Sequence, residues 1–379
     1  MTQKKIAVLT QPLGANYGGS LQNFALTHYL SVIGYNVKTV NRVNQNPHSK
    51  FKILLSGWKK LILKKILNKN VLTFSEQKKI FYSHNTFLLN NINLTEEIDN
   101  TYSLKQHFEE EKYDIVIVGS DQTWRPKYSP NIFNYFLDFL QGNNSIKKIV
   151  YATSFGTAEW EFTPEETKKC NDLSLEFDSV SVREKSGIDL CQQHLGLAPE
   201  WVLDPTMLLT KEDYLKVANK KKIPNRSGLF SYILDETVNI KRIIENAKTI
   251  LNVDSFINQP ISRSENPHGS TFEELVYPSV EGWIKAFDQA DFIVTNSFHG
   301  TVFCIIFNKP FLTIVNKQRG ASRFYSLLSE FKLEDRLVDE EDTHIESIVK
   351  SAVDFTFANQ RWDELKQQST AFLHQSLTK

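Results

Sequence analysis

The feature that most constrains the fold is a series of short, β-branched runs separated by helical stretches. The runs are apolar throughout instead of alternating with polar residues, which is typical of parallel strands covered by helices on both faces. The first series comprises Ile6 to Thr10, Val37 to Asn41, Asp114 to Gly119, Lys148 to Ser154 and Ser179 to Val182. The pattern predicts an α/β fold.

A second series of the same kind follows: Gly228 to Leu234, Val253 to Asn258, Asp291 to Asn296 and Pro310 to Val315. A chain of 379 residues can form two cores. We therefore predict two Rossmann-like, doubly wound domains, spanning 1–210 and 211–354, with the break just after the VLDPTMLL block. The helical pattern of 355–379 is expected to pack back onto the first domain.

The charge balance and the cysteines restrict the environment and the partners. Lys plus Arg and Asp plus Glu each total 44, so no global field attracts a nucleic acid. Cys170, Cys191 and Cys304 are odd in number and widely spaced, which fits neither a disulfide framework nor a metal site. With only a short apolar run after the N-terminal lysines and none long enough to span a membrane, we expect a cytoplasmic protein.

A glycine-rich segment connects the first predicted strand to a helix. Its candidate binding residues are Gly14, Asn16, Tyr17, Gly18 and Gly19. Glycines at the start of a helix allow a ligand to approach the backbone and the positive end of the helix dipole. The spacing is not that of a dinucleotide-binding loop. The alternative is a tight turn without a ligand.

Polar residues follow two of the predicted strands, at the edge where open α/β sheets bind ligands. Asp121 comes after the run DIVIVG and is a candidate base for an attacking hydroxyl; the alternative is a helix N-cap. Arg183 ends the fifth run, and its planar guanidinium suits a carboxylate or a phosphate. The alternative is an ordinary surface pair with Glu184.

The block DFIVTNSFHGTVFCIIFNKP is the most specific local signal. Ser297 is placed to cap a helix, with His299 and Gly300 in its first turn. Free amides at a helix start favour an anion, so the block predicts a phosphate site beside a titratable group. A histidine with a purely structural role is the alternative.

A basic loop, NKQRGASR, follows the next predicted strand and supplies Lys317, Arg319 and Arg323. These cations would complement an anionic donor, although a solvated, charged turn has the same composition. The sequence contains no metal-binding motif such as HExxH or a CxxC pair. We therefore expect a reaction that needs neither a metal nor a cofactor.

Five blocks together resemble the polysaccharide pyruvyl transferase family: NYGGSLQNFAL, VGSDQTWRP, VREKSG, VLDPTMLL and NSFHGTVFCIIFNKPF. The resemblance covers roughly Ile6 to Ser326. It implies a GT-B-like arrangement with an interdomain cleft, phosphoenolpyruvate as donor and pyruvate ketals on glycans as products. Arg183 and His299 match positions that hold the donor, whereas Asp121 is a less secure match as the base.

The acceptor is expected to be a sugar of a surface polysaccharide or of its lipid-linked precursor, with the first domain on the acceptor side and the second on the donor side. Two other functions remain open: a GT-B glycosyltransferase using a nucleotide sugar, and a non-catalytic protein that binds a glycan or phospho-ligand. The basic amphipathic stretch 51–69 predicts peripheral contact with a membrane surface, or a solvated helix packed on the first domain. The acceptor sugar and the oligomeric state are not specified.

Overall fold

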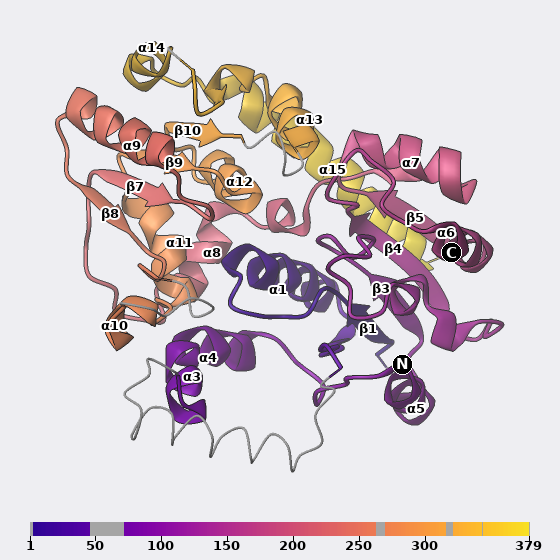
Figure 1. Ribbon diagram of the computed structural model, residues 1–379. Coiled ribbons are helices and arrows are strands. Elements are labelled where there is room, and N and C mark those ends of the chain that lie inside the picture. The colour runs from indigo at the N-terminus through magenta and orange to yellow at the C-terminus, as the bar shows by residue number, and fades with distance from the viewer. Residues whose placement is uncertain (1–2, 46–71, 263–269, 316–320, 343, 379) are drawn as a thin grey trace.

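Two parallel sheets organise the computed structural model, which describes residues 3–45, 72–262, 270–315, 321–342 and 344–378 (Figure 1). The first sheet has the strand order β2-β1-β3-β4-β5-β6. Its strands are β1 (Lys5–Leu9), β2 (Asn36–Thr39), β3 (Ile115–Val118), β4 (Lys147–Thr153), β5 (Ser179–Val182) and β6 (Glu200–Trp201). We call this sheet with its covering helices the first lobe.

The second sheet has the order β11-β10-β9-β7-β8 and belongs to the second lobe. Its strands are β7 (Leu229–Tyr232), β8 (Ser255–Ile257), β9 (Phe292–Thr295), β10 (Phe311–Ile314) and β11 (Leu337–Val338). The prediction of two Rossmann-like sheets is confirmed, and each of the nine expected strands is present with bounds within two residues. The two-residue strands β6 and β11 were not predicted, because so short a segment carries no periodicity.

Helices flank both sheets and begin at recognisable caps. Thr163, for example, starts α6 in a capping box with Glu166, and Pro164 occupies the first turn. The first lobe contains α1 (Tyr17–Val32), α3 (Phe74–Ile80), α4 (Tyr82–Asn91), α5 (Thr101–Glu111), α6 (Pro164–Ser174) and α7 (Lys185–Leu195). After it come α8 (Lys211–Ala218), α9 (Val238–Leu251), α10 (Phe272–Leu275), α11 (Val280–Gln289), α12 (Phe298–Ile306), α13 (Ala321–Phe331), α14 (Ile345–Lys350) and α15 (Thr356–Thr378).

Helix α1 lies between the two lobes and joins their cores (Figure 1). Tyr17, Leu21 and Phe24 belong to the same hydrophobic cluster as Phe230 and Trp283 of the second lobe. The Tyr17 ring stacks on Trp283 with centroids 5.8 Å apart and planes 8° from parallel. Helix α4 likewise packs against α11. A large apolar interface of this kind holds two lobes in one relative orientation.

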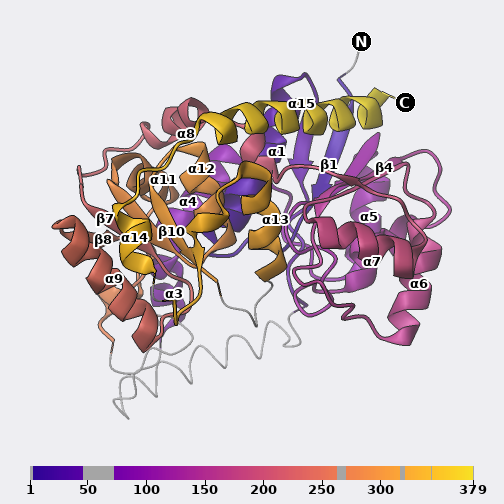
Figure 2. The ribbon, with the colours of Figure 1, turned by 90° about the horizontal axis from the view of Figure 1, so that it is seen from above.

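The C-terminal helix α15 returns from the second lobe to the first, as Figure 2 shows. Phe372, Leu373 and Leu377 pack in a cluster with Ile6 and Val8 of the central strand β1. The Ser369 hydroxyl accepts a hydrogen bond from the Leu203 amide at 2.9 Å. The last helix therefore completes the core of the first lobe.

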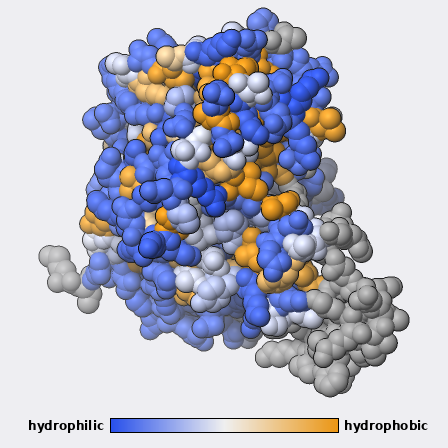
Figure 3. Space-filling model, turned by 90° about the vertical axis from the view of Figure 1, so that its left-hand side faces the viewer, coloured by the Kyte–Doolittle hydropathy of each residue, from blue (hydrophilic) through white to orange (hydrophobic). Residues whose placement is uncertain are grey.

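The surface and the length of the helices bear on membrane contact. Figure 3 views the outer side of the second lobe, where apolar side chains occur in small groups on a mainly hydrophilic face. Across the described part of the chain, no helix combines the length and the apolar character needed to cross a bilayer. The predicted amphipathic stretch 51–69 lies outside the described residues, so peripheral membrane contact stays a prediction.

Candidate active site

The carboxyl ends of parallel strands converge where the two lobes meet. Asp121 follows β3, Arg183 follows β5, Asp204 follows β6, and His299 lies in the first turn of α12 after β9. In parallel sheets, side chains that follow neighbouring strands share one edge. The structure brings these four side chains into contact, although 178 residues separate Asp121 from His299, the difference between their numbers.

Arg183 is the buried centre of this group, with only 5% of its surface exposed. Its Nη1 lies 2.8 Å from Asp204 Oδ2, and its Nη2 lies 3.4 Å from Asp121 Oδ1. Glu184 contributes a third carboxylate, 3.9 Å from Nε. Burial lowers the pKa of Arg183, but the three carboxylates outweigh it and raise the pKa. The alternative of a surface Arg-Glu pair is wrong, because both side chains are buried.

Asp204 joins the two lobes through one carboxylate. Its Oδ2 contacts Arg183 of the first lobe and lies 3.5 Å from Nε2 of His299 in the second, without hydrogen-bond geometry. Its Oδ1 accepts hydrogen bonds from the amide and the hydroxyl of Thr206, at 2.9 and 2.7 Å. Burial raises the pKa of Asp204, but His299, Arg183 and Thr206 outweigh it and hold the pKa below its usual range. The carboxylate is therefore a fixed anion.

His299 packs against the glycine-rich segment of the other lobe. A methyl group on Gly18 would overlap the imidazole, so only glycine allows this approach. Ser297 caps α12 by accepting a hydrogen bond from the Gly300 amide at 3.3 Å. A side chain at Gly300 would collide with Thr295. The Gly18 backbone thus contacts the imidazole directly, and the close approach of Gly300 to Thr295 fixes the start of the helix that carries His299.

Arg323 adds a second guanidinium from α13. The Phe298 ring lies 4.6 Å from Cζ of Arg183 and 5.5 Å from Cζ of Arg323, so both cations flank one ring. Burial and the nearby charge of Arg183 lower the pKa of Arg323 to about 10. We call Arg183, Asp204, His299 and Arg323 the interlobe cluster.

Three nitrogen atoms of the interlobe cluster are buried without a hydrogen-bond partner among the described residues. They are Nε of Arg183, Nε of Arg323 and Nε2 of His299. Buried polar atoms in native proteins are normally satisfied, and an unsatisfied one suggests a ligand or a functional role. An anion with several oxygen atoms would supply acceptors for these nitrogens and relieve the repulsion between the guanidinium groups.

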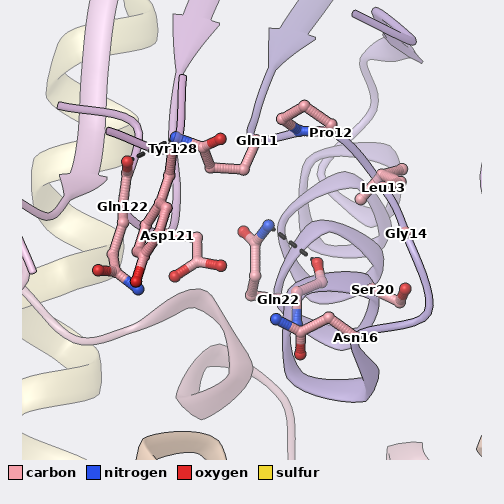
Figure 4. Close-up of a pocket in the computed structure, with 11 residues that line it drawn as sticks. Gln11, Pro12, Leu13, Gly14, Asn16, Ser20, Gln22, Asp121, Gln122 and Tyr128 are labelled. Carbon is pink, nitrogen blue, oxygen red and sulfur yellow. Dashed lines mark hydrogen bonds between the residues drawn. The ribbon is translucent and has the colours of Figure 1, made fainter. Parts of the chain in front are cut away.

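A cavity of about 300 Å³ adjoins the interlobe cluster through Asp121, which lines the cavity and lies 3.4 Å from Nη2 of Arg183. Figure 4 shows the Asp121 carboxylate between Gln122 and Tyr128 on one side and Gln22 and Asn16 on the other. The cavity is lined by Gln11, Pro12, Leu13, Gly14, Asn16, Gly19, Ser20, Gln22, Asp121, Gln122 and Tyr128. We call it the Asp121 cavity.

Asp121 holds an uncommon backbone conformation, with φ of 76°. Aspartate tolerates the left-handed region better than most residues, and such positions concentrate at functional sites. Its carbonyl accepts hydrogen bonds from the amides of Thr123 and Ser154, at 2.7 and 3.0 Å, which fix the turn. No helix follows it directly, so the alternative of a helix N-cap is wrong.

The residues of the glycine-rich segment lie in different environments. Gly14, Asn16 and Gly19 line the Asp121 cavity, and Asn16 also caps α1 by accepting a hydrogen bond from the Gly19 amide at 3.1 Å. Tyr17 is buried in the interlobe core, although it also lines a second cavity of about 340 Å³ at the ends of β7 and β8. Gly18 contacts His299.

The basic loop is only partly described. Arg323 belongs to the interlobe cluster, whereas Lys317 and Arg319 lie outside the described residues, and their role in donor binding stays a prediction. Asp204 was not predicted as a site residue, although it stands in the VLDPTMLL block. The position of this carboxylate directly after a short strand is the signal that sequence reasoning missed.

A buried pair beside the Asp121 cavity was also missed. The Ser20 hydroxyl, which lines the cavity, is hydrogen bonded to Nε2 of His84 at 2.7 Å. His84 is fully buried, and burial, opposed weakly by the backbone of Gly14, lowers its pKa to about 4. The neutral imidazole supports the glycine-rich segment from beneath.

A family model described as polysaccharide pyruvyl transferase matches residues 16–318. No curated protein sequence matches the chain.

Solved structures of other proteins share the fold at low sequence identity. A UDP-GlcNAc 2-epimerase from Methanocaldococcus jannaschii has a TM-score of 0.55 and 11% identity, covering 97% of this chain and 99% of that chain. A structure of the enzyme from the same organism in complex with UDP-GlcNAc and UDP has a TM-score of 0.53 and 12% identity, covering 97% of this chain and 100% of that chain. The enzyme from Neisseria meningitidis bound to UDP-GlcNAc gives 0.50 and 12%, covering 99% of both chains. The likeness shows a GT-B fold for this chain.

Proposed function

This chain belongs to the polysaccharide pyruvyl transferase family, and from that membership we propose that it transfers pyruvate from phosphoenolpyruvate to a sugar as a ketal. The acceptor is a sugar of a surface polysaccharide or of its lipid-linked precursor. The observation that carries the proposal is the set of three unpartnered nitrogens in the interlobe cluster, on Arg183, Arg323 and His299. The three cysteines are free and buried, which suits a reaction in the reducing cytoplasm.

Phosphoenolpyruvate suits the cluster because its carboxylate and its phosphate ester are both attached to the central carbon. Arg183 is oriented by Asp204, Asp121 and Glu184, so its Nε can donate from a fixed position. Arg323 has its pKa lowered by burial and by Arg183, and an anion beside it would relieve both effects. We therefore assign the donor to the space between these two guanidinium groups and His299.

The reaction requires a balanced exchange of two protons. Two hydroxyl oxygens of the acceptor bond to the central carbon of the donor, and the bond from that carbon to the phosphate oxygen breaks. Of the two hydroxyl protons, one is balanced by the proton gained at the methylene carbon and the other leaves with the phosphate. We assign Asp121 as the base that accepts a hydroxyl proton and His299 as the acid that protonates the methylene carbon.

The geometry supports this division of roles. Asp121 faces the Asp121 cavity with one oxygen directed at Arg183, while His299 stands on the opposite lobe against Gly18. An acceptor in the cavity would therefore approach a donor in the cluster across the Asp121 carboxylate. Positioning of two reactants in this way contributes to the rate in addition to acid-base catalysis.

The test is phosphate release from phosphoenolpyruvate with glycans or lipid-linked sugars from the source cell, accompanied by a mass gain on the acceptor. His299→Ala and Arg183→Ala should lower kcat/KM by roughly 10² or more. Lys216→Ala is the matched control, since its side chain on α8 is 74% exposed. Near wild-type kcat/KM in both site variants would overturn the assignment.

A thermal-shift comparison separates this function from its alternatives. Phosphoenolpyruvate should raise Tm, and His299→Ala should abolish the rise, because a ligand that binds only the folded state stabilises it. Stabilisation by UDP-GlcNAc and not by phosphoenolpyruvate would indicate a nucleotide-sugar enzyme. Stabilisation without phosphate release in the presence of glycans would indicate a binding protein.

A further inference from the structure

The chemical character of the Asp121 cavity restricts what can occupy it. Four side-chain amides line it, from Gln11, Asn16, Gln22 and Gln122. Asp121 is the one carboxylate among the described lining residues, which include no Lys, Arg or His. Amides and hydroxyls match the hydroxyl groups of a sugar, and none of these lining side chains offers a cation to an anionic ligand.

One wall of the cavity is supported by an ion pair between Arg125 and Glu161. The guanidinium of Arg125 binds Glu161 through two hydrogen bonds, from Nε at 2.7 Å and from Nη2 at 2.8 Å. Its remaining terminal nitrogen, Nη1, donates to Oε1 of Gln122 at 3.0 Å, and its Cζ lies 4.7 Å from the centre of the Tyr128 ring. The Glu161–Arg125 pair therefore positions both Gln122 and Tyr128.

This support decides which atoms of the wall are available to a ligand. With its oxygen held by Arg125, the Gln122 side chain has its amide nitrogen toward the cavity beside the Tyr128 hydroxyl (Figure 4). The Tyr128 side chain is 48% exposed, which leaves ring surface for a ligand. An aromatic face beside hydrogen-bond donors suits the apolar face and the hydroxyl edge of a pyranose.

Two further lining side chains, Gln11 and Gln22, are also held in place by hydrogen bonds. Nε2 of Gln11 donates to the Gln122 carbonyl and to the Ser129 hydroxyl, at 2.5 and 2.9 Å. Nε2 of Gln22 donates to the Thr10 hydroxyl and to the Gly19 carbonyl, at 2.8 and 2.9 Å. Side chains that are already ordered lose little conformational entropy on binding.

We infer that the Asp121 cavity is the subsite for one uncharged pyranose ring of the acceptor. This inference rests on the proposed function, because it places a sugar hydroxyl at the assigned base. A volume of about 300 Å³ is at the lower end of the range for ligand sites and fits a single ring. Gln122 and Tyr128 set the specificity, and a uronic acid or a sugar phosphate is rejected because Asp121 faces it without a lining cation.

The test measures sugar binding to the full chain in the absence of phosphoenolpyruvate. The probes are the methyl pyranosides of glucose, galactose, mannose and N-acetylglucosamine, with methyl glucuronide as the charged comparison, followed by ligand-observed NMR. At least one neutral glycoside should bind, and the affinity for the glucuronide should be lower by about tenfold or more. Equal or tighter binding of the glucuronide, or no binding of any neutral glycoside, would overturn the inference.

Variants locate the site. Gln122→Ala and Tyr128→Ala should each weaken binding of the neutral glycoside about tenfold, since each removes one recognition group. Tyr102→Ala is the matched control, because this tyrosine is 70% exposed on α5 and lies outside the cavity. Unchanged affinity in both cavity variants would contradict the inference.

A second variant distinguishes positioning from contact. Glu161→Gln leaves every lining side chain intact but weakens the ion pair that holds Arg125, so glycoside affinity should fall while the Tm shift with phosphoenolpyruvate stays as in the wild type. Equal glycoside affinity would refute the role of this pair as a support for the site. Specific glycoside binding together with a failure of phosphate release in the earlier assay would leave the subsite standing and refute pyruvyl transfer.

Discussion

The imidazole of His299, on the second lobe, rests directly on the backbone of Gly18, on the first. The two residues are separated by 281 positions, the difference between their numbers, and come from two of the five sequence blocks that resemble the family. Their contact makes the glycine-rich segment part of the support for the histidine. A change in one lobe therefore acts on the chemistry of the other.

Gly18→Ala should displace His299, because the added methyl group would occupy the space of the ring. We expect kcat/KM to fall by roughly 10² with little change in secondary structure, as for misplacement of a catalytic group. The measurement is the phosphate-release assay, with circular dichroism to check folding. Lys216→Ala, on the exposed surface of α8, is the control. A Gly18→Ala protein that keeps the wild-type Tm shift with phosphoenolpyruvate and wild-type kcat/KM contradicts this account.

Asp204→Asn should destabilise the fold and weaken the site together. Removing the charge leaves the Arg183 guanidinium in a buried position with a neutral neighbour. The free energy of unfolding should therefore fall by about 3 kcal/mol at pH 7. The folded-state pKa of Asp204 lies below its ordinary value of 3.8, so its stabilising contribution is present above that pH and is lost as the pH falls further. Urea unfolding at pH 7 and at about pH 2 checks both expectations.

The matched control for Asp204 is Asp335→Asn. Asp335 also pairs with an arginine, at 2.7 Å from Arg336, but its side chain is 60% exposed. Exposed ion pairs contribute little to stability, so this change should lower the free energy of unfolding by at most about 1 kcal/mol. Equal effects of the two substitutions would show that the interlobe position of Asp204 has no special importance.

His84 should make stability depend on pH. Burial lowers the pKa of His84 in the folded state to about 4 from its ordinary value of 6.5, so between these values the unfolded chain binds a proton that the folded chain does not. The free energy of unfolding therefore keeps its full value above pH 6.5. It decreases as the pH falls towards 4, by up to roughly 3 kcal/mol. His84→Gln should flatten this part of the curve, whereas the exposed His28→Gln should not. Parallel slopes for wild type and His84→Gln would contradict the prediction.

The last helix should be required for the stability of the first lobe. Leu373 is fully buried against the sheet, and Leu373→Ala should lower the free energy of unfolding by about 2–5 kcal/mol. Gln375, on the exposed side of the same helix, provides the control, and Gln375→Ala should change it by less than about 0.5 kcal/mol. Urea titrations of the three proteins decide the matter, and equal midpoints for wild type and Leu373→Ala would argue against the docking of α15.

The strands were predictable because each carries its own signal. β3 and β9, for example, consist of four consecutive buried residues, and burial on both faces requires apolar side chains at every position. β6 and β11 have two residues each, too few to show a period. Helix starts were predictable for the same reason, since Ser297 caps α12 through a contact three residues away.

The candidate site was predictable only in part, because its key contacts are not local. The sequence indicates Arg183 and His299 as separate ligands of a donor. Asp204, the carboxylate that links them, reaches both only because the two lobes pack together. The same holds for His84, whose hydrogen bond to Ser20 spans 64 residues. Sequence spacing along an element reveals a cap or a strand, whereas contacts between elements depend on the whole topology.

The stacking of Tyr17 on Trp283 has a consequence for how this molecule can be divided. Helix α1 contributes core residues to the second lobe, and helix α15 contributes core residues to the first lobe. Neither half, expressed alone, would carry its complete set of apolar partners. An exchange of halves between family members must therefore transplant both terminal helices with their matching surfaces, and thermal unfolding of the intact chain is expected to occur as one transition.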